Sequence, residues 1–219
     1  MLVLKGDFDS LYNKAILLTK SEKHKEAVEF FDKAFEVDSN HANALSKKGI
    51  TLAKLGKDEE AVVCFENSLK INPNQLYTLY NKGVLLNFLG KYPDSLASFD
   101  KALEINPNDS DSLYEKGISL AKLEKYGKAA EFFDKAGVSL VKSSNYEKAL
   151  ASFDKALEIK PNYLKALSNK GVVFANLGKF EESLVCFDKA LEIEPKNVSI
   201  LSNKNLALDK INEKKVVSL

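Results

Sequence analysis

The stretch from Leu79 to Asn108 reads LYNKGVLLNFLGKYPDSLASFDKALEINPN, and it decides the fold because its pattern returns along the chain. Closely similar stretches begin at Leu45 and at Leu167. The step from Gly83 to Gly117 equals the step from Gly49 to Gly83, so the pattern has a fixed period. A unit of about 34 residues that lacks strand-like alternation and carries a proline near its end predicts two antiparallel helices and a turn. The sequence therefore predicts an all-α fold.

The apolar residues of one unit indicate how its two helices pack. Leu79, Gly83 and Leu86 are spaced i, i+4, i+7, so they share one stripe of the first helix. In the second helix, Phe99 lies between small residues on one face, and its ring is expected to insert where Gly83 has no side chain. Pro107 then ends the helix, because proline lacks a backbone donor and disfavours α geometry in the preceding residue.

Set out in this way, the chain resembles the tetratricopeptide repeat family over roughly residues 8 to 213. The family pattern combines apolar residues, a Gly or Ala, an aromatic residue, small residues and a Pro at fixed positions of each unit. The unit from Leu76 matches it apart from Lys82, which stands where Leu is usual. Units from Phe8, Ala42 and Leu164 match in the same register. The resemblance implies a right-handed α–α superhelix of helix hairpins, with a C-terminal capping helix from Val198.

The period breaks between Gly117 and Gly137, which lie closer together in the sequence than the other equivalent glycines. This step is shorter than the usual one by about 14 residues, which make about 3.9 helical turns, so the apolar stripe resumes nearly in phase. We therefore predict a single helix from about Tyr126 to Lys142, which is the second helix of one hairpin and the first helix of the next.

The break divides the predicted organisation into three segments. An N-terminal array covers residues 8–126, the shared helix covers residues 127–142, and a C-terminal array with its capping helix covers residues 143–213. Both a tolerated slip between repeats and a functional break are compatible with the sequence.

Composition argues against several classes of partner. The chain has 219 residues and a formal net charge of +1. All its basic residues are lysines, so it lacks the guanidinium group that suits phosphate and guanine, and we expect no nucleic-acid partner. No window approaches the roughly 18 apolar residues of a spanning helix, so we expect no membrane association and a cytoplasmic location.

The sequence also lacks the residue sets of common catalytic sites. His24 and His41 have no partner at metal-ligand or triad spacing, and we expect both on surface turns. No glycine-rich phosphate loop is present. Cys64 and Cys186 occupy equivalent positions in distant units, so they are expected to be unpaired and half-buried. We therefore predict a non-enzymatic protein without catalytic residues, metal or cofactor.

Function is instead expected on the first helices, which line the concave side of a stack of hairpins. The sixth repeat position carries Asn four times, and a side-chain amide can both donate to and accept from the backbone of an extended peptide. The fifth position carries several tyrosines, which combine apolar area with a polar tip. The predicted partner-binding residues are Tyr12, Asn13, Lys47, Tyr77, Tyr80, Asn81, Tyr114, Asn169 and Asn203. The alternatives are ordinary packing of the tyrosines and an incidental family preference for Asn.

One known binding mode of the family does not carry over. Chaperone-binding members hold two carboxylates with Lys, Asn and Arg at fixed positions in three units. The corresponding positions in the three units from Phe8 hold Tyr12, Ile16, Lys47, Tyr77 and Asn81. An acidic chaperone tail is therefore a disfavoured partner.

Two hypotheses follow. The first is an interaction scaffold or adaptor that binds an extended or helical segment of a partner protein in the concave groove. The alternative is a structural protein that forms homo-oligomers through the irregular central helix.

Overall fold

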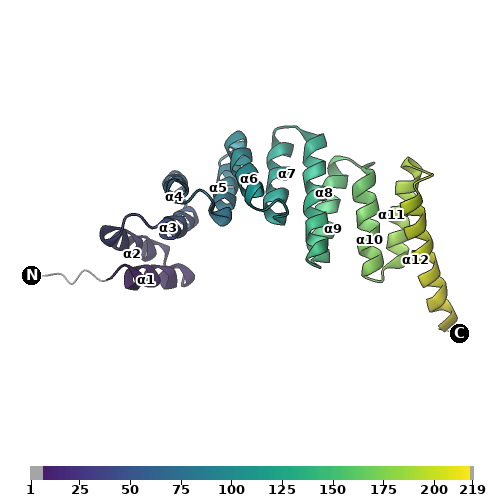
Figure 1. Cartoon of the computed structure of the whole chain (residues 1–219), viewed down its shortest axis with the longest axis horizontal. Coiled ribbons are helices and arrows are strands. Elements are labelled where there is room, and N and C mark those ends of the chain that lie inside the picture. The colour runs from purple at the N-terminus through teal and green to yellow at the C-terminus, as the bar shows by residue number, and fades with distance from the viewer. Residues whose placement is uncertain (1–6, 218–219) are drawn as a thin grey trace, which may run out of the picture. The chain divides into compact units, whose positions relative to one another are not determined.

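The computed structural model describes residues 7–217, which form twelve α-helices and no strand (Figure 1). This confirms the all-α fold class. The helices are α1 (Phe8–Lys20), α2 (His24–Val37), α3 (Ala42–Lys54), α4 (Asp58–Ile71), α5 (Leu76–Phe88), α6 (Tyr92–Ile105), α7 (Ser110–Lys122), α8 (Tyr126–Lys142), α9 (Tyr146–Ile159), α10 (Leu164–Asn176), α11 (Phe180–Ile193) and α12 (Val198–Val217).

The chain divides into two compact units between Pro107 and Asn108. Unit 1 contains α1–α6 and unit 2 contains α7–α12. The array predicted over residues 8–126 extends across this division, so its behaviour as one array remains a prediction.

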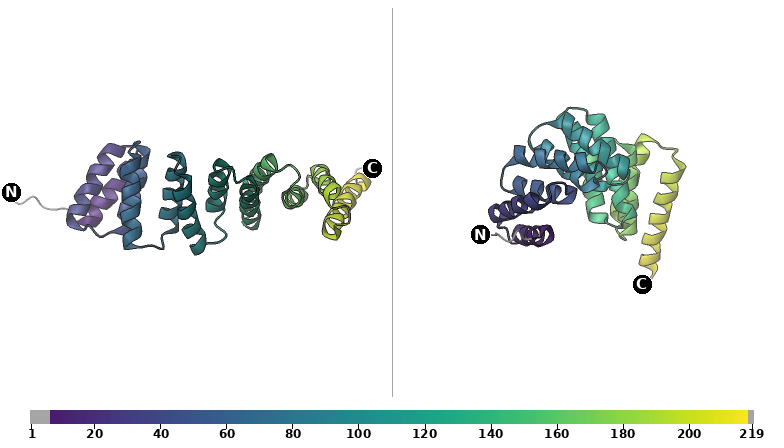
Figure 2. Two further views of the ribbon diagram at one scale, coloured as in Figure 1. Left: turned by 90° about the horizontal axis from the view of Figure 1, so that it is seen from above. Right: turned by 60° about the vertical axis from the view of Figure 1, so that its left-hand side comes forward.

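Helices that follow one another pack as hairpins within each unit. In unit 1 the pairs are α1 with α2, α3 with α4, and α5 with α6. In unit 2, α8 packs against both α7 and α9, α10 packs against α11, and α12 covers α11. Figure 2 lets the reader follow this side-by-side arrangement inside each unit. The final helix therefore has the place expected of a capping helix.

Glycine and phenylalanine set the distance between the helices of a hairpin. A Cβ atom added to Gly83 would lie 2.6 Å from the ring of Phe99, which is fully buried. A Cβ atom on Gly171 would lie equally close to Phe187. The ring therefore inserts where the glycine has no side chain, as the sequence predicts.

The ends of the helices also follow the sequence. Helices α4 and α6 end at Ile71 and Ile105, and Asn72 and Asn106 adopt extended backbone directly before the prolines. At the start of α7, the carboxylate of Asp109 accepts a hydrogen bond from the backbone N–H of Ser112 at 3.0 Å. Such a cap satisfies one of the free donors of the first helical turn.

A single helix, α8, spans Tyr126 to Lys142, as the break in the period predicts. Its Phe133 lies against Gly117 of α7, where an added Cβ would be 3.0 Å from the ring. Its Gly137 lies against Phe153 of α9, where an added Cβ would be 2.5 Å from the ring. The helix thus supplies the phenylalanine of one hairpin and the glycine of the next.

Ion pairs join successive hairpins in a way that the sequence analysis missed. A lysine directly before the glycine position pairs with an acid on the preceding second helix, as in Lys82 with Glu66 at 2.9 Å. The same kind of pair joins Lys48 with Asp32, Lys170 with Asp154 and Lys204 with Asp188. The acids are about half exposed, so each pair adds little stability and mainly fixes the register of the two hairpins.

Candidate functional site

The predicted binding residues lie on first helices of both units. Tyr12 and Asn13 are on α1, Lys47 is on α3, and Tyr77, Tyr80 and Asn81 are on α5, all in unit 1. Tyr114, Asn169 and Asn203 are on α7, α10 and α12 of unit 2.

A hollow of about 330 Å³ in unit 1 brings three of these residues together. Tyr12, Lys47 and Tyr77 line it, from α1, α3 and α5. The ammonium group of Lys47 lies 5.0 Å from the ring centre of Tyr77, a cation–π distance. Because Tyr77 is 55% exposed, its ring and the lysine beside it remain accessible to a ligand.

Apart from Tyr77, each predicted tyrosine packs against the phenylalanine of its own hairpin. The ring centre of Tyr12 is 6.1 Å from that of Phe31, Tyr80 is 6.3 Å from Phe99, and Tyr114 lies edge-on to Phe133 at 5.0 Å. All three are half-buried, and burial raises the pKa of Tyr12. These rings therefore support the fold while leaving one edge at the surface.

The four predicted asparagines do not share one environment. The side-chain amide of Asn81 donates a hydrogen bond to the backbone oxygen of Tyr77 at 2.6 Å, which leaves one N–H and the carbonyl for a ligand. Asn169 donates to a carboxylate oxygen of Asp134 at 3.0 Å. Asn13 is exposed, and Asn203 is half-buried beside α10.

A second hollow of unit 1 was not predicted. It holds about 420 Å³ between α3 and α5, and its apolar wall includes Ile50, Val84 and Phe88. Phe88 is 79% exposed, the largest exposed fraction among the exposed large hydrophobic residues. The signal in the sequence is that Phe88 stands where α1, α3 and α7 carry a lysine.

Four residues of α5 form a continuous surface that connects the two hollows. Tyr77, Asn81, Val84 and Phe88 are spaced i, i+4, i+7, i+11 and lie on one side of the helix. We call this set the α5 stripe. It is about 16 Å long at 1.5 Å per residue, which matches an extended segment of about five residues.

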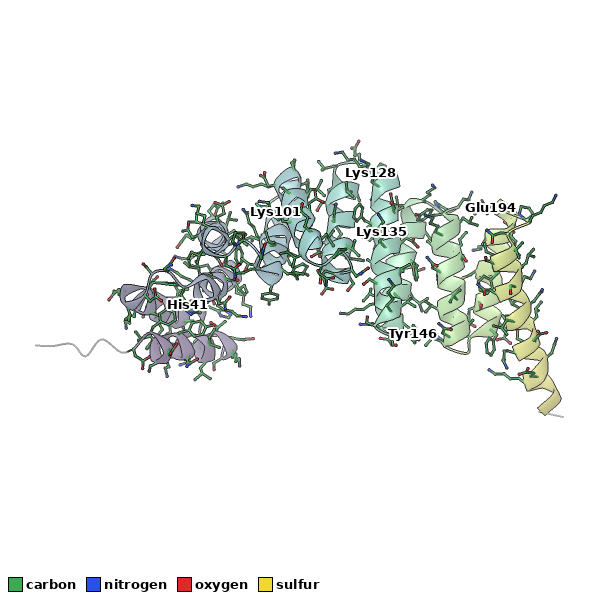
Figure 3. All side chains as sticks on the ribbon, viewed as in Figure 1. His41, Lys101, Lys128, Lys135, Tyr146 and Glu194 are labelled. Atoms are coloured by element: carbon green, nitrogen blue, oxygen red, sulfur yellow. The ribbon has the colours of Figure 1, made fainter. Side chains whose placement is uncertain are left out.

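Unit 2 contains a buried carboxylate that the sequence analysis missed. Asp134 of α8 is 6% exposed, although equivalent acids elsewhere are about half exposed and pair with a lysine on the first helix that follows. For Asp134 the following first helix is α8 itself, and Ala136 occupies the position of that lysine, directly before Gly137. Burial raises the pKa of Asp134, whereas the bond from Asn169 and the charges of Lys165 and Lys135 (Figure 3) oppose that shift.

The residue types of common metal and catalytic sites are dispersed in the described part of the chain. Among residues 7–217, no cluster of His, Cys, Asp and Glu could hold a metal ion. Cys64 and Cys186 are free and buried, and burial raises the pKa of both thiols. His24 and His41 lie at helix starts, and Nδ1 of His41 accepts a hydrogen bond from the backbone N–H of Ala44. No helix in the described part of the chain has the length and apolar character needed to cross a membrane.

Sequence models of one repeat family match most of the chain. Models described as tetratricopeptide repeat match residues 8–41, 42–75, 76–109, 98–131 and 164–197, and a model described as TPR repeat matches residues 137–178. No curated protein matches the chain.

The chain is similar to several solved structures. MamA from Desulfovibrio magneticus RS-1, from residue 41 to its end, is 23% identical, with 88% of this chain and 98% of that chain covered and a TM-score of 0.53. A tetratricopeptide repeat protein from Parabacteroides merdae is 18% identical, with 92% and 84% covered and a TM-score of 0.55. YrrB, described as a TPR protein with an unusual peptide-binding site, is 27% identical, with 89% and 90% covered and a TM-score of 0.49.

Proposed function

Because the chain belongs to the tetratricopeptide repeat family, we propose that it is a non-catalytic scaffold or adaptor that binds an extended or helical segment of a partner protein. The observation that carries this proposal is the α5 stripe. It has an exposed aromatic residue in each of two hollows, Tyr77 and Phe88, and the amide of Asn81 lies between them. Aromatic anchors around a polar group are typical of surfaces that bind peptides.

The chemistry of the stripe indicates how a segment is held. The hollow beside Phe88 accepts an apolar side chain against Ile50 and Val84. Lys47 and Tyr77 accept a carboxylate or a backbone carbonyl at the other end. The remaining N–H and the carbonyl of Asn81 lie between them and can bond the backbone of the segment, whatever its sequence.

The remaining predicted residues belong to the same proposal. Asn13, Tyr12 and Tyr80 extend the surface of unit 1, and Tyr114, Asn169 and Asn203 provide a further set in unit 2. We also propose a cytoplasmic location, with neither nucleic acid nor membrane as a partner, since the chain keeps two free buried thiols and all its basic residues are lysines.

Selection from a random peptide library on the immobilised protein tests the proposal. We expect enriched peptides whose affinity falls at least about tenfold in Tyr77→Ala and in Phe88→Ala, because each change removes a large anchor. Val63→Ala is the control, since Val63 is similarly exposed but lies on α4. Circular dichroism verifies that each variant remains folded. Enrichment no better than on a blank surface would refute the proposal, and so would Tyr77→Ala and Phe88→Ala variants that bind the peptides as tightly as the wild type.

A triple variant tests the residues predicted from sequence. We expect Ala at Asn13, Tyr80 and Asn81 to weaken binding of the same peptides without unfolding the chain, since the two amides hold the backbone of the segment and Tyr80 anchors it. Undiminished binding would remove these residues from the site while leaving Tyr77 and Phe88 as candidates.

A second candidate function is self-association through the region of α8. The observation that favours it is a hollow of about 650 Å³ that opens between α7 and α9, the largest of the hollows described. A protein that assembles with itself would use this surface in addition to the α5 stripe.

A further inference from the structure

The hollow between α7 and α9 has an apolar floor and a polar rim. We call it the α7–α9 hollow, and it is lined by Tyr114, Ile118, Ala121, Lys122, Tyr126, Phe133, Lys155, Glu158 and Ile159. Helices α7 and α9 both pack on α8, and between them Phe133 forms part of the floor. Lys155 and Glu158 form an ion pair at 2.6 Å, with both side chains substantially exposed.

Two smaller hollows of the chain are built from the same repeat positions. Ile118, Ala121 and Phe133 of the α7–α9 hollow correspond to Ile50, Ala53 and Phe65 of the hollow between α3 and α5. They also correspond to Val172, Ala175 and Phe187 of a hollow between α10 and α12. The internal repeat therefore shows what normally lies against this surface.

In both smaller hollows the opposite wall is the first helix of the following unit. That wall consists of Asn81, Val84, Leu85 and Phe88 on α5, and of Asn203, Leu206, Ala207 and Lys210 on α12. In the α7–α9 hollow no such helix is present, because α8 is both the second helix of one hairpin and the first helix of the next. The end of α9 lies there instead, and the hollow is about 650 Å³, against about 420 and 290 Å³ for the other two.

The missing wall defines the shape of the ligand. The α7–α9 hollow fits a helix that presents the residue pattern of a first helix, with apolar side chains at two adjacent positions and polar ones a turn before and after. Docking of an amphipathic helix in an apolar groove between two helices is a general mode of recognition.

Helix α1 carries this pattern on a face that is exposed at Leu17. Its residues Asn13, Ile16, Leu17 and Lys20 occupy the repeat positions of the four wall residues on α12 and α5. Leu17 is 59% exposed, whereas the equivalent Leu85 and Ala207 are 7% and 1% exposed beneath the preceding first helix. Within unit 1, α1 packs on α2 and α3, which lie away from Leu17.

We propose that α1 of a second copy of the chain docks in the α7–α9 hollow, where it replaces the missing first helix. Leu17 of one copy then lies against Ile118 and Ala121 of the other. Because the two surfaces differ, the contact is head-to-tail and can continue from copy to copy unless it closes into a ring. This inference rests on the second candidate function and adds to it the identity of the two surfaces.

Analytical ultracentrifugation of the full chain over a range of concentrations tests the proposal. We expect concentration-dependent association that weakens at least about tenfold in Leu17→Glu and in Ile118→Glu, because each places a charge in an apolar contact. Tyr126→Glu is a second variant of the hollow, for use if Ile118→Glu perturbs the fold. Because Tyr126 is 55% exposed, the new charge at this position remains in contact with water. Val63→Glu and Val185→Glu are matched controls, 54% and 55% exposed on second helices, and should associate normally.

Mixing the two defective variants gives the decisive result. Leu17→Glu keeps an intact hollow and Ile118→Glu keeps an intact α1, so an equimolar mixture should form a 1:1 dimer that grows no further. A mixture that stays monomeric overturns the head-to-tail contact. Association that survives Leu17→Glu overturns the role of α1 but leaves self-association in place. A wild-type chain that is monomeric at all concentrations overturns both, and the peptide-selection experiment is independent of these outcomes.

Discussion

At the scale of single residues, the fit of a phenylalanine ring against a glycine determines how closely the two helices of a hairpin approach. The ring of Phe99 lies where a Cβ atom of Gly83 would be. In an interior packed as densely as an organic crystal, neither group can move aside without disturbing its neighbours. The contact is thus a steric requirement repeated in each hairpin with a glycine.

Gly83→Ala should destabilise the chain by up to about 2 kcal/mol, because overlap of the new methyl group with Phe99 costs about 1–3 kcal/mol and the gain in helix propensity returns roughly 1 kcal/mol. Gly127→Ala is the matched control, since a Cβ atom there meets nothing within 4 Å. It should be neutral or stabilising by up to about 1 kcal/mol. Urea denaturation followed by circular dichroism measures both, and equal effects of the two substitutions would contradict the steric explanation.

Asp134→Asn should change how stability depends on pH. Burial makes the pKa of Asp134 higher in the folded than in the unfolded chain, so its stabilising contribution is complete below the unfolded-state pKa of about 4 and is lost as the pH rises through the folded-state value. Asn keeps the oxygen that accepts the bond from Asn169 and removes the charge. The variant should therefore have a higher melting temperature than the wild type near neutral pH.

Melting temperatures of both proteins between about pH 3 and pH 8 provide the comparison, and the difference should shrink in acid as the wild-type carboxyl is protonated. The lowered pKa of Glu131, caused mainly by its bond to Lys135, acts in the opposite direction but is present in both proteins. A constant difference across the pH range would mean that Asp134 is not the group responsible.

At the scale of helices, a single continuous apolar stripe on α8 packs against both α7 and α9. Ala129 and Phe133 are buried, with Phe133 against Gly117 of α7, and the equally buried Gly137 and Leu140 continue the stripe, with Gly137 against Phe153 of α9. Any change in the number of residues between these pairs rotates one of them away from its partner.

One alanine inserted between Ala136 and Gly137 should therefore destabilise unit 2 by about 3 kcal/mol or more. The added residue rotates the rest of the helix by about 100°, so that Gly137 no longer lies against the ring of Phe153. One alanine inserted after Pro161, in the exposed turn before α10, is the control and should cost far less. Chemical denaturation of both proteins decides the matter. Similar losses would show that the phase of α8 is unimportant.

Most of the fold could be predicted because its determinants are local. The spacing of glycines and prolines determines the hairpins, and the phase of the stripe across the break predicts α8 with its ends at Tyr126 and Lys142. What the sequence could not supply are contacts between residues far apart. The bond from Asn169 to Asp134 joins α10 to α8, and the pairs between lysines and acids join successive hairpins.

The candidate site was predicted less completely for the same reason. Side-chain type indicated the tyrosines and asparagines, but only packing decides that Tyr77 is exposed while Tyr12 lies against Phe31. Phe88 was missed because an aromatic residue on an apolar stripe is usually part of the core, and its exposure depends on where its neighbours end.

At the scale of the whole molecule, each unit has its own buried core. In unit 1 a cluster is centred on Leu52, Phe65 and Leu85, and in unit 2 a cluster is centred on Leu167 and Phe187. In a repeat protein, stability arises from each repeat and its immediate neighbours, so a division between repeats leaves each part largely self-supporting.

Fragments 1–107 and 108–219 should therefore each fold when expressed alone, with the helix content of the corresponding part of the full chain. Both should melt cooperatively, because each contains its own buried core. Circular dichroism with thermal melting measures this. A fragment without cooperative melting would show that its core requires the other unit.

The shared helix α8 also bears on how such arrays change in length during evolution. Because the missing stretch corresponds to nearly a whole number of helical turns, its loss would leave the apolar stripe of the joined helix in phase. Arrays of this kind can accordingly shorten by half a repeat instead of by whole repeats. Each such shortening exposes a surface that a complete array would keep covered, and so offers natural selection a new place for recognition.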